Sequence, residues 1–151
     1  MQATTVLDAP AHDASHVTRS ITRHAPGAAR VLLGLVFFVF GLDGFLHFVP
    51  QPDPSTIPPG ALAFGGALMG TGYMFPLIKG TETLVGALLL ANRFVPLALV
   101  LLAPVVVNIV LFHAFLAPAG MAIPIVVVLL QVFLAWTHRR AYRPLLEARA
   151  S

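Results

Sequence analysis

Residues 73–90 have the sequence YMFPLIKGTETLVGALLL. This stretch is apolar enough to lie in a bilayer, yet it carries Lys79 and Glu82 one helical turn apart. Charged side chains at membrane depth are costly and need partners. The stretch therefore predicts a membrane-spanning helix whose charged pair is enclosed by the rest of the chain.

The composition of the whole chain agrees with a membrane protein. Of its 151 residues, 58% are hydrophobic and only 10% are charged, and the mean hydropathy is +0.87. An ordinary soluble domain is about 45–50% apolar and about 25% charged. The chain has no cysteine, which excludes disulfides, iron–sulfur clusters and thiol catalysis.

Four apolar stretches are long enough to be membrane spans, which need about 20 residues each. We expect an all-α integral membrane four-helix bundle with spans at about residues 30–49, 73–90, 94–115 and 121–137. The proline-rich sequence PQPDPSTIPP at residues 50–59 predicts a loop. A short apolar helix at about residues 60–71 is too short to cross, so we expect it to be interfacial or re-entrant. Its Gly66 and Gly70 form a GxxxG pattern, which permits close helix contact.

The two ends of the chain are more polar. We expect residues 1–29 to be a mobile polar tail with a short helix near residues 15–23, and residues 141–151 to be a C-terminal tail. His12 and His16 have the spacing of one helix face. We interpret them as solvated side chains, because two ligands without a third make a poor metal site.

The basic residues predict the orientation in the membrane. They lie before the first span, between spans two and three, and after the fourth, as Arg19, Arg23, Arg30, Arg93, Arg139, Arg140 and Arg143. Four spans place all of them on one side, which the positive-inside rule identifies as cytoplasmic. The net charge of +3 therefore indicates topology, and we expect no nucleic-acid partner.

Polar side chains on all four spans predict a layered pocket. They are Asp43 and His47 on the first span, Lys79 and Glu82 on the second, Asn108 and His113 on the third, and Gln131 on the fourth. At about 1.5 Å per residue, Glu82, Asn108 and Gln131 share a depth of roughly 14 Å. The two histidines lie nearer the outer face. We expect a pocket inside the bundle that opens outward.

Within this pocket, we expect Asp43 to pair with Lys79, and Glu82 either to pair with Lys79 or to carry a proton. These three would be the catalytic residues, and His47, Asn108, His113 and Gln131 would bind the ligand. As an alternative, buried polar residues also hold membrane helices together without any further role. A second alternative makes His47 and His113 axial haem ligands, in place of histidines facing the membrane interface. We expect no metal-ion site.

Several motifs together resemble one protein family. GLDGFLHF, GALMGTGYMFPLIKGTETLVGALLL, NRFVPLALVLLAPVVVNIVLFHAF and LAWTHRR are similar to the DoxX family of small four-span bacterial membrane proteins, across residues 30–145. The resemblance implies a four-helix bacterial inner-membrane protein, and the arginine pattern above places both of its termini in the cytoplasm. The family's namesakes are associated with quinone-linked oxidation of sulfur compounds, and relatives serve in redox maturation.

The family's recurrent polar positions correspond to Lys79, Glu82, Asn108 and His113. Two positions depart from the family pattern. Asp43 stands where an asparagine is frequent, and Gln131 stands where a glutamate is frequent. The glutamine at position 131 weighs against a proton-carrying role for the fourth span.

Three functions are compatible with these residues. In a quinone-linked redox subunit, Lys79, His47 and Asn108 would donate hydrogen bonds to quinone carbonyls and Glu82 would accept a proton. The apolar wall would come from Phe45, Phe75 and Phe112, and electrons would pass to a redox partner protein, since no flavin or metal motif is visible. The alternatives are a non-enzymatic assembly subunit, which holds a partner or a second copy through its apolar faces, and a carrier of small solutes or protons.

Overall fold

The computed structural model describes the backbone of residues 13–146 and the side chains of residues 24–144. This part of the chain is all-helical and contains no strand. Its α-helices are α1 (Asp13–Leu46), α2 (Pro59–Gly70), α3 (Met74–Leu90), α4 (Val95–Phe115) and α5 (Ala122–Thr137). Three short 3₁₀ segments complete it: η1 (Pro54–Thr56), η2 (Pro118–Gly120) and η3 (Arg139–Leu146).

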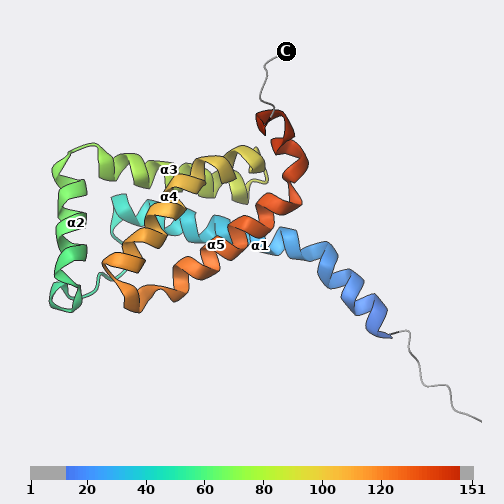
Figure 1. Cartoon of the computed structure of the whole chain (residues 1–151), viewed down its shortest axis with the longest axis horizontal. Helices are drawn as coiled ribbons and strands as arrows, with labels where there is room; N and C mark the ends of the chain where they lie inside the picture. Colours follow the sequence, from blue (N-terminus) through green and yellow to red (C-terminus); the bar gives the residue numbers. More distant parts are fainter. Residues whose placement is uncertain (1–12, 147–151) are drawn as a thin grey trace, which may run out of the picture.

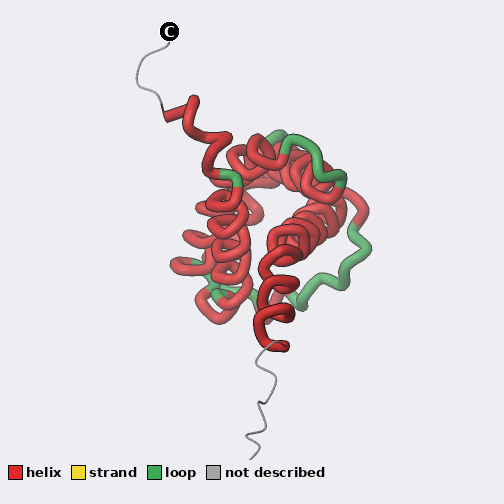
Figure 2. The backbone as a smooth tube through the Cα atoms, turned by 90° about the vertical axis from the view of Figure 1, so that its right-hand side faces the viewer, coloured by secondary structure: helices red, strands yellow, loops and turns green. Residues whose placement is uncertain are grey.

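Four of the helices form a bundle that α2 closes at one end. In Figure 1, α1, α3, α4 and α5 lie alongside one another, and α2 runs across the end of the bundle. α1 and α4 each pack against both α3 and α5, so the four helices form a ring, seen end-on in Figure 2. The core lies inside this ring, where each helix contributes one fully buried leucine: Leu33, Leu89, Leu102 and Leu134.

The contact between α1 and α3 is the most extensive in the bundle, and glycines make it close. A Cβ atom added at Gly41 would lie 2.5 Å from the backbone nitrogen of Thr83. One added at Gly86 would meet the backbone of Phe38 at a still shorter distance. Glycine at these positions lets two backbones approach where any side chain would hold them apart.

Two helical segments are long and apolar enough to cross a membrane by themselves, namely His24–Leu46 and α4. α2 and α3 satisfy the same test only as a pair, and they are bent by 93° at the break between them. α5 is apolar but has only 16 residues. The described residues therefore contain two candidate spans, or three if the bent pair counts as one.

The start of the first helix differs from the sequence-based expectation. α1 is one helix from Asp13 onward and includes Pro26, although an irregular tail was expected up to residue 29. A proline inside a helix removes one hydrogen bond and crowds the carbonyl four residues before it, and α1 has an anchor just beyond this position. The Arg30 guanidinium donates to the carbonyl oxygens of Leu89 and Leu90, which end α3. His12 and the side chain of His16 lie outside the described residues.

The end of the first helix also differs, since α1 stops at Leu46 rather than at residue 49. His47 has a left-handed backbone with φ of 52°, and its N–H donates to the Asp43 carbonyl. That conformation cannot continue a right-handed helix. At the other terminus, part of the expected tail is helical, because η3 runs from Arg139 to Leu146; residues 147–151 lie outside the description.

The bend between α2 and α3 depends on Gly72, whose φ is +74°. We expect Gly72→Ala to lower the free energy of unfolding by about 1–2 kcal/mol, because a Cβ atom disfavours the left-handed region. Gly70→Ala is the matched control, since it ends α2 and has nothing within 4 Å of an added Cβ. Unfolding titrations in mixed detergent micelles compare the two. Equal stability of both variants would show that the bend does not depend on this conformation.

Candidate functional site

The two charged residues of α3 form an ion pair in which the carboxylate is buried and the lysine side chain is 22% exposed. The Lys79 ammonium lies 2.9 Å from a Glu82 carboxylate oxygen, and Glu82 is only 5% exposed. The same ammonium donates to the carbonyl oxygen of Phe40 on α1, at 3.3 Å. Among the described residues, this is the one ion pair closer than 4.0 Å. It lies against α1, where the ammonium reaches the Phe40 carbonyl oxygen.

Space for the lysine comes from a glycine on the neighbouring helix. A Cβ atom added at Gly44 would collide with the Cγ and Cδ atoms of Lys79. The aliphatic stem of the lysine therefore lies flat against α1, while its ammonium reaches Glu82. Lys79 and Glu82 lie three residues apart on α3, and this spacing brings them together on one face of the helix.

A pocket of about 570 Å³ opens beside this pair, between the end of α1, the following loop, α2 and α3. Its lining residues are Phe40, Asp43, Gly44, His47, Val49, Pro50, Gln51, Pro52, Met69, Phe75 and Lys79. The Lys79 ammonium lies 6.0 Å from the centre of the Phe75 ring, a cation–π distance. The pocket thus combines a cationic hydrogen-bond donor with aromatic and thioether walls.

Asp43 lines this pocket, but the expected pairing of Asp43 with Lys79 is wrong. One Asp43 oxygen accepts from the backbone N–H of Val49 at 2.7 Å, and the other from the Gln51 side-chain amide at 3.1 Å. Both oxygens are thus used by the loop that follows α1, because those donors come within reach once the helix stops at Leu46. Asp43 is 8% exposed and shapes the wall of the pocket.

The three candidates on α4 and α5 lie outside this pocket. Asn108 is exposed and borders a separate space beside α2 and α3. The His113 ring Nδ1 lies 2.8 Å from the Ile109 carbonyl oxygen of its own helix. Gln131 donates to the Leu99 carbonyl oxygen at 3.1 Å, between α4 and α5. Equal depth along a helix axis does not decide which face a side chain occupies, so the layered pocket with members from all four spans does not form.

Of the other residues expected at the site, some line the Lys79 pocket and others lie outside it. His47 and Phe75 line the pocket with Lys79, whereas Phe45 is 48% exposed and Phe112 packs against Phe64. Within the described part of the chain, no group of three or more His, Asp and Glu side chains is placed to hold a metal ion.

Sequence reasoning missed Gln51, Met69 and Phe40 as wall residues. Gln51 lies in a proline-rich loop, and Met69 lies in the last turn of the short apolar helix α2. Nothing in either local pattern indicates a site. Both residues reach the pocket only because the loop and α2 fold back over the end of α1.

The opposite end of the bundle carries the basic residues. Arg30 binds the end of α3, Arg93 follows that helix, and Arg139 follows α5 and lies 5.2 Å from the Trp136 ring. The Tyr142 hydroxyl donates to the Pro96 carbonyl oxygen at 3.3 Å, which ties η3 to the start of α4. Burial raises the pKa of Tyr142, so the hydroxyl stays protonated and remains a donor.

No protein-family model matches the chain, and comparisons with curated proteins and with solved structures find no significant match.

Proposed function

We propose that this protein is an integral membrane subunit that binds a quinone in the pocket beside Lys79 and exchanges electrons with a redox partner protein. One observation carries the proposal: a lysine ammonium, paired with a buried glutamate, lies in a pocket with aromatic and thioether walls. A quinone head group has two carbonyl acceptors on a flat apolar ring. A cationic donor beside apolar walls complements both features.

The same residues suit the proton chemistry of a quinol. Oxidation of a quinol to a quinone releases two electrons and two protons, so a site for it needs a proton acceptor near the ring oxygen. Glu82 is the carboxylate paired with Lys79, and His47 lines the pocket together with Lys79. We assign Lys79 to one ring oxygen, Glu82 to one of the two protons and His47 to the other, and the partner protein receives both electrons.

For the membrane arrangement, we propose four spans formed by α1, α3, α4 and α5 in a bacterial cytoplasmic membrane. Support comes from the arginines at one end of the bundle and their absence from the loops at the other. By the positive-inside rule, the arginine end and both termini are cytoplasmic, and the quinone pocket faces outward. The resemblance to the DoxX family is the source of the bacterial and quinone elements of this proposal.

The test is quinone extraction from protein purified gently out of its own membranes. We expect bound quinone in the wild type and about tenfold less in Lys79→Met and in Glu82→Gln, since hydrogen bonds to charged groups contribute about 1.5–3 kcal/mol. Asn108→Ala is the control, because Asn108 lies outside the pocket. Quinone retained at the wild-type level in both pocket variants would overturn the proposal.

A second candidate function has its own supporting observation. The GxxxG glycines of α2, Gly66 and Gly70, have nothing within 4 Å of an added Cβ. This close-contact face is therefore unused within the described chain, and an assembly subunit would use it to hold a partner helix. Cross-linking in native membranes tests this function. A dominant adduct that disappears in Gly66→Leu would favour it over quinone binding.

A further inference from the structure

A second pocket lies between α4 and α5, apart from the residues around Lys79. Its volume is about 340 Å³. Its lining residues are Ala103, Val106, Val107, Val110, Leu111, Val128, Gln131, Val132 and Ala135. Apart from Gln131, all are alanine, valine or leucine. An engineered apolar cavity of about 150 Å³ already accommodates benzene, so this pocket has room for a fused-ring molecule.

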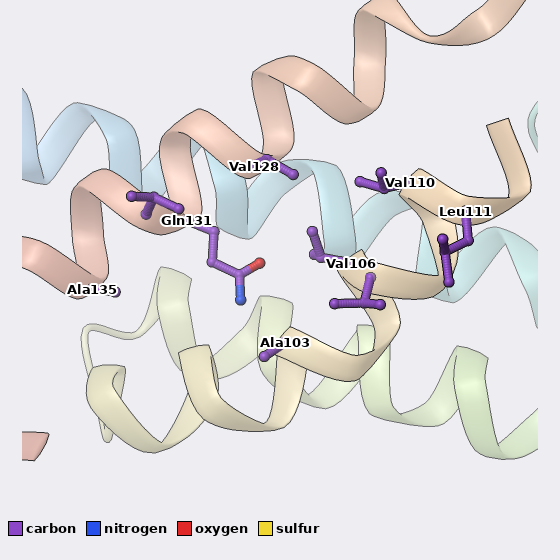
Figure 3. Close-up of a pocket in the computed structure, with 9 residues that line it drawn as sticks. Ala103, Val106, Val110, Leu111, Val128, Gln131 and Ala135 are labelled. Atoms are coloured by element: carbon purple, nitrogen blue, oxygen red, sulfur yellow. The ribbon is translucent and has the colours of Figure 1, made fainter. Parts of the chain in front are cut away.

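One polar atom in this pocket has no partner. The amide nitrogen of Gln131 donates to the Leu99 carbonyl oxygen at 3.1 Å, which holds the side chain across the space between the helices (Figure 3). Its amide oxygen is buried and accepts no hydrogen bond from the described chain. A buried acceptor without a donor costs about 1–3 kcal/mol, so a ligand that supplies the donor gains that stabilisation.

The surroundings define the class of molecule that supplies this donor. A water molecule would find few further partners, because buried waters typically make about three hydrogen bonds and the other lining residues are apolar. Access is lateral, since Val107, Leu111 and Val132 are each at least 50% exposed on the outer surface of the bundle. An occupant would therefore enter from the lipid phase.

We propose that this pocket binds a lipid-soluble cyclic alcohol or phenol, whose hydroxyl donates to the Gln131 amide oxygen and whose ring body fills the space between α4 and α5. This site therefore favours a ligand that carries a hydrogen-bond donor. The Lys79 pocket offers a cationic donor and suits an acceptor, so the two sites differ in the chemistry they recognise.

A matched pair of probes tests the hydroxyl directly. Binding of 1-naphthol and of naphthalene to the full chain in nanodiscs is measured by equilibrium dialysis, and empty nanodiscs correct for partition into lipid. We expect 1-naphthol to bind roughly three- to tenfold more tightly, the effect of one hydrogen bond. In Gln131→Leu, this preference should vanish while naphthalene binding persists.

Two further variants establish where the probes bind. Val107→Phe places a ring into the pocket from an exposed position and should weaken both probes. Leu97→Phe places the same ring at another exposed position of α4, away from the pocket, and should change neither. Equal binding of the two probes by the wild type, or a preference that survives in Gln131→Leu, would overturn the proposal. Quinone binding in the Lys79 pocket is measured separately, by extraction, so a failure of this proposal differs from a failure of the proposed function.

Discussion

Gly86→Ala is expected to lower the free energy of unfolding by about 2–3 kcal/mol, the upper part of the range for overpacked sites. The added Cβ would meet the backbone nitrogen and Cα of Phe38, and a helix backbone cannot rotate aside as a side chain can. α1 would have to move away from α3, along the most extensive helix contact of the protein. Unfolding titrations in mixed detergent micelles measure the loss.

Gly80→Ala supplies the comparison on the same helix. Gly80 has nothing within 4 Å of an added Cβ, so alanine there gains only helix propensity, worth up to about 1 kcal/mol. The two variants should therefore change stability in opposite directions. If Gly86→Ala were as stable as Gly80→Ala, the close approach of α1 to α3 at this residue would be wrong.

Removal of Lys79 alone is expected to cost about 3–5 kcal/mol of folding free energy, because it leaves a buried carboxylate without a cation. Lys79→Met is the appropriate change, since methionine keeps an unbranched stem against Gly44. The double variant Lys79→Met/Glu82→Leu removes both charges. It should recover most of the loss, because replacing both members of a buried pair by apolar residues is often nearly neutral.

A double-mutant cycle in mixed micelles measures this coupling, with Glu82→Leu as the other single variant. Arg140→Met is the control for loss of a cation at an exposed position, and we expect it to shift stability by no more than about 0.5 kcal/mol. Additive losses from the two single changes would mean that Lys79 and Glu82 do not stabilise each other. The cycle also separates stability from ligand binding, because it needs no quinone.

The stretch at residues 73–90 determined much about this protein by local chemistry. The i, i+3 spacing brings Lys79 and Glu82 together on one helix face, and the apolar residues around them make enclosure necessary. Helix starts and ends also follow local rules. Pro96 lies in the first turn of α4, where its missing N–H costs nothing, and the backbone of Asn92 takes the left-handed conformation that ends α3.

The tertiary structure alone decided which polar residues share a site. Depth along the helices placed Glu82, Asn108 and Gln131 together, but each helix can rotate about its axis, and the sequence pattern of α4 has no polar face to define that rotation. Packing turned Asn108 away from the Lys79 pocket and turned Gln131 toward α4.

Asp43 shows the same limit of local reasoning. Its predicted depth in the membrane matched that of Lys79 and favoured pairing, yet its oxygens accept from Val49 and Gln51. Those donors depend on where α1 ends, and that end depends on the left-handed backbone of His47. The sequence thus determined the helices and one charged pair. The sequence did not predict which side chains of different helices and loops are hydrogen-bonded to each other. A hydrogen bond forms only within a range of a few tenths of an ångström, and only the packing of the chain sets distances that closely.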